Sequence, residues 1–73
     1  MAEFPERLLA LRKANGLTQK QLALESNLSE VGIKSYERNI REPAYRQLIS
    51  LADFFNVSLD YLVGRTDNPE INR

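Results

Sequence analysis

The sequence predicts an all-α fold built from five short helices, and three observations point to it. Strand signals are missing, because no alternating run of β-branched and aromatic residues lasts four positions. Residues typical of helix ends recur along the chain, and the apolar residues between them follow helical spacing. With 73 residues the chain can form one small domain, which would bury only about 60% of the surface that its unfolded form exposes.

The first helix is expected to run from Pro5 to Asn15, since proline suits a first helical position and Gly16 suits the residue after a helix. A second helix is expected from Gln19 to Ser26. Thr18 offers a hydroxyl at its start, and Gln21, three residues on, completes the pattern of a capping box.

A short turn separates the second helix from the third. Asn27 belongs to the few residue types besides glycine that tolerate a left-handed backbone. Ser29 suits the N-cap of a third helix, which is expected from Glu30 to Arg38. The inward face of that helix is set by Ile33 and Tyr36.

The fourth helix is expected from Ala44 to Phe55, with Pro43 at its start and apolar residues at helical spacing inside it. Ser58 suits the N-cap of a short fifth helix, Leu59 to Val63. Gly64 closes that helix.

One domain is expected over residues 1–66, and residues 67–73, which lack helical periodicity, are expected to form a tail or the start of a linker. Cysteine and histidine are absent, which excludes a disulfide framework and a thiolate metal site. The sequence contains no nucleophile–base pair, metal constellation or phosphate loop, so we expect no enzyme, no cofactor and no small-molecule substrate. Its longest apolar run is far shorter than a membrane span, and it begins without an export signal. A cytoplasmic protein is therefore expected.

The net charge of zero argues by itself against a nucleic-acid partner, but the charges are unevenly distributed. Residues 1–11 carry −1, residues 12–46 carry +3 and residues 47–73 carry −2. The central excess of Lys and Arg hints at an anionic partner. A solvated surface with some clustering explains it equally well.

The most informative segment is Gln19 to Tyr36, which holds two short helices joined by a tight turn. A helix-turn-helix needs a small residue where its helices cross, which Ala23 supplies, and a residue that tolerates a left-handed turn, for which Asn27 serves. With Ile33 and Tyr36 buried, the third helix turns one face outward. That face carries Glu30, Val31, Lys34, Ser35 and Arg38. Hydroxyl, apolar and charged groups on one face can read base edges in a major groove.

These residues, with others over all five helices, resemble the Cro/CI-type helix-turn-helix domain, also called the XRE family, of phage and bacterial regulators. The resemblance spans about Phe4 to Thr66. The motifs that carry it are Arg7-Leu8, Leu11-Arg12, Gly16-Leu17-Thr18-Gln19, Leu22-Ala23, Ile33, Tyr36-Glu37, Glu42-Pro43, Leu51-Ala52 and the run from Phe55 to Leu62. The resemblance implies a compact five-helix, lambda-repressor-like fold with the helix-turn-helix at the second and third helices. The chain departs from the family at Asn27, where glycine is usual.

By this resemblance the third helix is the recognition helix and lies in the major groove. The base-facing residues would be Ser29, Glu30, Val31, Lys34 and Ser35. The phosphate-binding residues would be Thr18 and Gln19 at the start of the second helix, and Arg38, Asn39 and Arg41 at and beyond the end of the third. Arg12 and Glu37 match a partly buried structural ion pair, and Ile40 matches a contact between two copies.

Several of these assignments keep a second interpretation. Glu30 either accepts a hydrogen bond from cytosine N4 or is a first-turn acid, favoured by the helix dipole and paired with Lys34. Lys34 either reads guanine or contacts phosphate, and Val31 either touches a thymine methyl group or is a simple exposed apolar residue. Gly32 either allows a close approach to DNA or is a neutral small residue. Ile40 either belongs to a dimer contact or is a surface isoleucine without a role.

The resemblance implies sequence-specific binding to double-stranded DNA by a transcription regulator, in the first place a repressor. It would act as a homodimer on a palindromic operator with half-sites about 34 Å apart, one helical turn. The alternative is a protein-binding module on the same fold, such as an antitoxin or anti-repressor, for which exposed Leu9, Leu24 and Ile40 would serve. The salt dependence of DNA binding separates the two, since a protein-directed domain should hardly bind a duplex.

Overall fold

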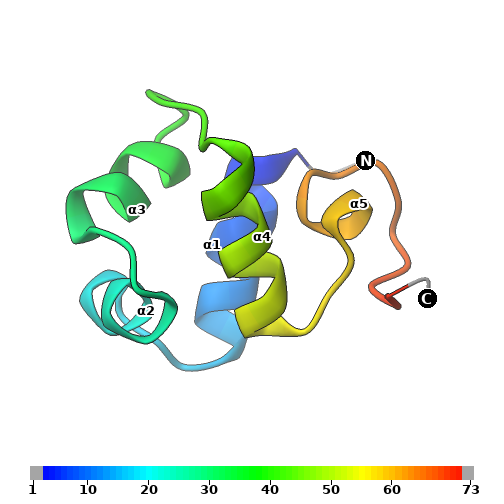
Figure 1. Ribbon diagram of the computed structural model, residues 1–73, viewed down its shortest axis with the longest axis horizontal. Helices are drawn as coiled ribbons and strands as arrows, with labels where there is room; N and C mark the ends of the chain where they lie inside the picture. Colours follow the sequence, from blue (N-terminus) through cyan, green and yellow to red (C-terminus); the bar gives the residue numbers. More distant parts are fainter. Residues whose placement is uncertain (1–2, 72–73) are drawn as a thin grey trace.

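Five helices follow one another through residues 3–71, the part of the chain that the computed structural model describes (Figure 1). They are α1 (Phe4–Ala14), α2 (Gln19–Ser26), α3 (Glu30–Glu37), α4 (Tyr45–Phe55) and α5 (Leu59–Leu62). No strand occurs among the described residues, and the predicted all-α class is confirmed. Residues 1–2 of the expected domain and 72–73 of the expected tail lie outside this part. None of the described helices reaches the length and hydropathy of a membrane span.

Three helices begin with a hydroxyl cap, as their sequence predicts. In each case the side-chain oxygen of the N-cap residue accepts a hydrogen bond from the backbone N–H three residues on. These caps are Thr18 at α2, Ser29 at α3 and Ser58 at α5, at 3.0, 2.9 and 3.0 Å. A cap of this kind contributes about 1 kcal/mol by satisfying a donor that the helix itself leaves unpaired.

The other two helices begin differently from the prediction. α1 starts one residue early, at Phe4, and the Glu6 carboxylate accepts a hydrogen bond from the Glu3 N–H at 3.1 Å. α4, expected from Ala44, begins one residue later, two residues after Pro43. Ala44, which follows it, keeps an extended backbone with ψ 166° and serves as the N-cap, so the helix begins at Tyr45.

The tight turn between α2 and α3 depends on Asn27, which adopts the predicted left-handed conformation with φ 60°. Its neighbour Leu28 then donates its N–H to the carbonyl of Ala23 at 2.8 Å, which closes the end of α2. Asn56 ends α4 in the same conformation with φ 56°, which the sequence analysis does not anticipate.

The core takes one fully buried side chain from each helix. These are Leu8, Leu22, Ile33, Leu51 and Leu62, in the order α1 to α5. Burying a side chain of this size stabilises the fold by roughly 1.5–3 kcal/mol relative to leaving it exposed. Because every helix contributes to the same cluster, the position of α3 depends on the whole domain rather than on α2 alone.

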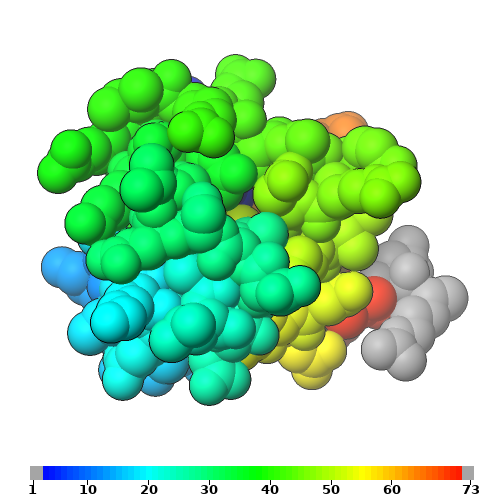
Figure 2. Space-filling model, turned by 60° about the vertical axis from the view of Figure 1, so that its left-hand side comes forward, coloured from blue at the N-terminus to red at the C-terminus, as the bar shows by residue number. Residues whose placement is uncertain are grey.

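α2 and α3 pack against each other at one side of the molecule (Figure 1), and α1 also packs against α3. α5 and the last described residues lie at the opposite side. Figure 2 turns the α2–α3 side forward, with α2 in cyan and α3 in green above it. The described residues that follow α5 therefore leave that side uncovered.

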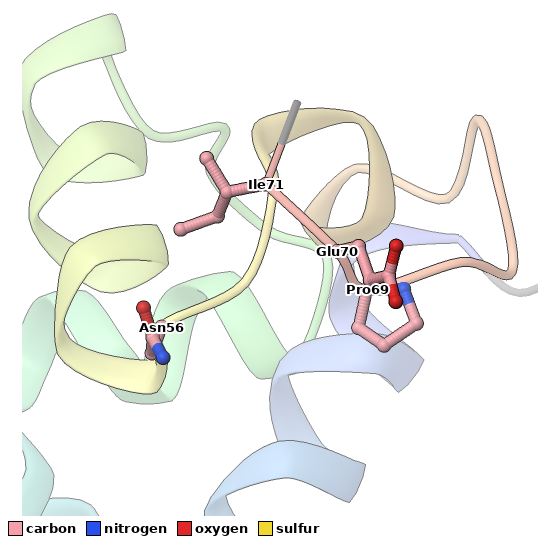
Figure 3. Close-up of a pocket in the computed structure, with 4 residues that line it drawn as sticks. All are labelled: Asn56, Pro69, Glu70 and Ile71. Atoms are coloured by element: carbon pink, nitrogen blue, oxygen red, sulfur yellow. The ribbon is translucent and has the colours of Figure 1, made fainter. Parts of the chain in front are cut away.

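The segment after α5, expected to become a tail at residue 67, follows the surface of the domain. The Ser58 N–H donates to the carbonyl of Pro69 at 3.0 Å. A shallow pocket of about 390 Å³ is lined by Asn56, Pro69, Glu70 and Ile71, and the Ile71 side chain points toward α4 (Figure 3). Residues 67–71 thus contact the helical body although they form no helix.

Candidate nucleic-acid interface

The outward side of α3 carries the five residues that the sequence analysis expects there. This α3 face consists of Glu30, Val31, Lys34, Ser35 and Arg38. Val31 is 65% exposed, and Lys34 and Arg38 are exposed as well. On the inner side, Ile33 and Tyr36 are buried in the core, and this burial sets the rotation of the helix. The face consequently offers an apolar group, a hydroxyl and charges of both signs to a partner.

Glu30 and Lys34 contact each other one helical turn apart. The Glu30 carboxylate lies 3.5 Å from the Lys34 ammonium, and the two side chains are 41% and 46% exposed. The pairing that the sequence analysis gives as one interpretation of Glu30 is therefore present. At this exposure such a pair is worth less than about 1 kcal/mol, so a partner can separate the two groups.

Ser29 stands just before the α3 face and has two roles open to it. Its Oγ accepts the N–H of Gly32, while its own hydroxyl proton stays free to be donated outward. Gly32 itself is buried, and a Cβ built there would lie 2.8 Å from the Ser29 Oγ and 3.7 Å from the Tyr36 ring. Of the two interpretations given for Gly32, the close approach to DNA does not hold, because this residue is buried in the domain.

The start of α2 presents unpaired backbone donors. Thr18 and Gln21 satisfy each other through the predicted capping box, at 2.8 and 3.0 Å. The backbone N–H groups of Gln19 and Lys20 have no acceptor within the described residues. Free N–H groups at the positive end of a helix dipole favour an anion such as phosphate.

The side chain of Gln19 is engaged inside the protein, although the sequence analysis assigns the residue to phosphate. Its amide donates a hydrogen bond to Glu37 at 3.0 Å. One amide hydrogen and the backbone N–H of Gln19 stay available to a partner. This tie between the first residue of α2 and the last residue of α3 has no local signal in the sequence.

Arg12 and Glu37 form the ion pair that the resemblance implies. The Arg12 side chain is 12% exposed and that of Glu37 is 6% exposed. A further guanidinium nitrogen of Arg12 donates to the carbonyl of Leu17 at 2.9 Å. Hydrogen bonds to Glu37 raise the pKa of Arg12 above its ordinary value, although burial opposes the shift. The pair thus joins α1, the loop before α2 and the end of α3.

The loop after α3 brings further polar groups to the same side of the molecule. Asn39 takes a left-handed conformation with φ 58°, which turns the chain away from the helix axis. The N–H groups of Ile40 and Arg41 both donate to the carbonyl of Ser35, at 2.9 and 3.4 Å. Arg38, Asn39 and Arg41 are exposed, and Ile40 is 73% exposed. Two guanidinium groups at the end of α3 are the kind of side chain that contacts phosphate.

Arg7 is a buried charged residue for which the sequence analysis expected no role. Its guanidinium carbon lies 3.9 Å from the centre of the Tyr61 ring, and a guanidinium nitrogen donates to Asp67 at 3.1 Å. Contact with Tyr61, and then with Asp67, raises the pKa of Arg7 against the effect of burial. One signal was available, since Arg7 lies on the same helical stripe as Phe4 and Leu11. No sequence signal pointed to its partners, Tyr61 on α5 and Asp67 after it.

The chain is similar to one protein family and to several known proteins. A model of the helix-turn-helix family matches residues 8–62. The uncharacterized HTH-type transcriptional regulator YobD of Bacillus subtilis is 38% identical over 67 residues, which cover 92% of this chain and 60% of YobD. The cryptic phage CTXphi transcriptional repressor RstR of Vibrio cholerae is 40% identical over 63 residues, which cover 86% of this chain and 56% of RstR. This chain therefore spans between about half and three fifths of the length of these curated relatives.

Among solved structures, the P22 c2 repressor in complex with synthetic operator 9T has a similar fold. The TM-score is 0.80 and the sequence identity is 32%, over 86% of this chain and 96% of the repressor chain. The likeness thus extends over most of this chain and nearly all of the repressor chain.

Proposed function

The chain belongs to the helix-turn-helix family, and on that premise we propose that it binds double-stranded DNA sequence-specifically as part of a cytoplasmic transcription regulator. The observation that carries this proposal is the α3 face. It is exposed and held in one rotation by Ile33 and Tyr36, and it mixes groups that can recognise base edges. No chemistry is required of the protein, since occupying a promoter is enough to change transcription.

In the proposed complex α3 lies in the major groove. The base-facing residues are Ser29, Glu30, Val31, Lys34 and Ser35. Phosphates on either side are bound by the start of α2, through Thr18 and Gln19, and by Arg38, Asn39 and Arg41 at and after the end of α3. The Arg12–Glu37 pair, with Gln19 attached to it, supports this proposal because it ties the two phosphate-binding regions to each other.

We further propose that the regulator acts as a homodimer on a palindromic operator, in the first place as a repressor. RstR carries the name of repressor, and P22 c2 is a repressor seen with an operator. A single copy has few basic groups at the interface, so two copies on one DNA are needed for useful affinity. Ile40, exposed beside the interface, would lie between the copies.

A protein-binding module remains the second candidate function, favoured by two exposed apolar side chains. Leu24 and Ile40 are both 73% exposed. Leu9, the third residue expected to serve such a module, is half-buried and offers less surface than the sequence analysis assumes. The two remaining side chains lie on different elements, α2 and the loop after α3.

The proposed function is tested by selecting binders from a pool of random duplexes with this chain, at low and then at moderate salt. Enrichment of an inverted repeat supports specific recognition by two copies and gives the half-site spacing. Enrichment of a single half-site supports recognition but means that the part responsible for dimerisation is outside this chain. If nothing is enriched and no duplex binds at low salt, the repressor hypothesis is wrong and a protein partner must be sought.

The salt dependence of binding to the selected duplex counts the phosphate contacts. With Arg38 and Arg41 as the charged contacts of each copy, the logarithm of the binding constant should fall with a slope of about −2 per copy, and about −4 for two copies. A slope near zero for a duplex that nevertheless binds would contradict the proposed phosphate contacts.

A further inference from the structure

The ion pair between Glu30 and Lys34 sets the α3 face apart from an ordinary basic surface. The carboxylate and the ammonium lie 3.5 Å apart, and both side chains are about half exposed. A pair this exposed contributes little to stability, and the dipole of α3 alone would favour an acid at its first turn. The dipole does not explain why a lysine, Lys34, pairs with this acid and keeps its charge on the outward side of the helix.

The charges on the α3 face divide between two tasks. Arg38, one turn beyond Lys34, is exposed and forms no ion pair within residues 3–71, so its guanidinium can turn to phosphate. Lys34 is held toward the N-terminal tip of α3 by Glu30. Residues near the N-terminus of a recognition helix are those that meet base edges, so Lys34 and Glu30 lie at the part of the helix suited to them.

A carboxylate in this place has a strong effect on which duplexes are tolerated. Duplex DNA carries one negative charge per about 1.7 Å of its axis, so an unpaired Glu30 would weaken binding to every sequence. An ionised carboxylate only accepts hydrogen bonds. It therefore needs a base-edge donor on the DNA to compensate for the loss of its lysine.

A G·C pair satisfies both members of the ion pair together. Guanine offers the acceptors N7 and O6 to an ammonium, and cytosine next to it offers the N4 amine to a carboxylate. With the lysine over the purine, an A·T pair would set the adenine N6 amine, in the place of guanine O6, beside the ammonium, and thymine O4 and a methyl group against the carboxylate. A C·G pair would set the amine against the ammonium. In both replacements a donor takes the place of an acceptor beside the ammonium, and the position that faces the carboxylate loses its donor.

We propose that Glu30 and Lys34 act as one unit that selects a G·C base pair, with Lys34 on guanine and Glu30 on cytosine. Glu30 acts mainly by rejection, since it lowers affinity for duplexes that lack the cytosine amine at that position. This inference rests on the proposed function, because it concerns how α3 reads DNA.

The test compares the wild-type chain with Glu30→Ala and with the control Glu25→Ala. Glu25 is an exposed acid of α2, so its removal changes the net charge equally without touching the α3 face. Each variant is titrated with the duplex selected above and with versions in which one G·C pair at a time becomes A·T. At one position, the ratio of the dissociation constant of the substituted duplex to that of the selected duplex should be about tenfold smaller for Glu30→Ala than for the wild type. The reason is that the variant binds the substituted duplex more tightly. Glu25→Ala should leave every ratio unchanged.

A second variant keeps the test sharp should Glu30→Ala alter the start of α3. Glu30→Gln retains the shape of the side chain and loses only its charge, and it should lower the same ratio at the same position. If both variants bind all duplexes tighter by one common factor, Glu30 is only a helix-end acid and the inference is overturned while the proposed function stands. A wild-type chain that binds DNA without sequence preference overturns both, before any variant is compared.

Discussion

The guanidinium of Arg12 and the carboxylate of Glu37 meet through two contacts, Nε to Oε2 at 2.6 Å and Nη2 to Oε1 at 3.0 Å. Two-point contacts of this kind fix the relative orientation of the groups as well as their distance. Since Glu37 is the last residue of α3 and also accepts the amide of Gln19, the pair sets α3 against α1 and against the start of α2. The surface proposed to face DNA is thus held by a contact behind it.

Removing one member of this pair should be costly. Glu37→Ala leaves the Arg12 charge nearly buried without its partner, and we expect the free energy of unfolding to fall by about 3–5 kcal/mol in urea denaturation. The double variant Arg12→Leu with Glu37→Leu should lose less than Glu37→Ala, since no charge is then stranded. Glu30→Ala is the control, and it should cost less than about 1 kcal/mol. A loss for Glu37→Ala as small as that of the control would contradict the structural role.

The turn between α2 and α3 should accept glycine at position 27 and resist alanine. Asn27 has φ 60°, and a residue with a Cβ and no local hydrogen bond is strained by about 1–2 kcal/mol in that region. Asn27→Ala should therefore lower the free energy of unfolding by about 1 kcal/mol, whereas Asn27→Gly should be close to neutral. Lys20→Ala, an exposed change on α2, serves as the matched control. Equal stabilities of the alanine and glycine variants would show that the turn relaxes to another conformation.

Arg7 should stabilise the contact of α1 with α5 through its guanidinium rather than through its surface ion pair. Arg7→Met keeps an apolar stem but loses the contact with the Tyr61 ring, and we expect a loss of about 1–3 kcal/mol. Asp67→Ala removes only the partner, whose side chain is 81% exposed, and should cost less than about 1 kcal/mol. Urea unfolding of the two variants checks this, and the reverse order of the two losses would refute it.

Lys34 and Arg41 should affect DNA binding in different ways. Lys34→Ala should change the sequence preference, because we propose that its ammonium reads a base. Arg41→Ala should weaken all duplexes by a similar factor and reduce the magnitude of the salt slope by about 1 for each bound copy, as expected for a phosphate contact. Titration of the selected duplex and of a random duplex over a range of salt measures both. Equal losses on the two duplexes for Lys34→Ala would defeat the first half of this prediction.

The control for that comparison lies on the far side of the molecule. Arg65 is exposed and pairs with Asp60 on α5, away from α2 and α3. Arg65→Ala should change neither the preference nor the salt slope. A reduced slope for this variant would mean that the bound DNA extends beyond the proposed interface.

Much of the fold could be predicted because the signals that encode it are local. α2 has the bounds that the sequence predicts, beginning directly after its capping-box threonine, and the other four helices differ from expectation by a single residue at one end or both. Caps and apolar spacing depend on residues three or four positions apart, which a linear sequence displays directly. The motifs over all five helices also suffice to identify the Cro/CI-type family, and the comparisons confirm that identification.

The sequence predicted which residues of the candidate site face outward, but not the contacts that hold α3 in place. Burial of Ile33 and Tyr36 determines which residues α3 turns outward, so the α3 face follows from periodicity alone. The Arg12–Glu37 pair was anticipated only through resemblance. The inward direction of Gly32 was not recognised, because it depends on where the Tyr36 ring lies.

By itself the sequence determined the helices, the left-handed turn at Asn27 and the outward face of α3, since each of these is set by interactions within one or two turns of the chain. Only the tertiary structure decided the contacts between elements. Arg7 reaches Tyr61 and Asp67, and Gln19 reaches Glu37, across separations that no pattern of spacing encodes. Such contacts exist only after five buried side chains, one from each helix, have packed into one core and fixed how the helices lie against each other.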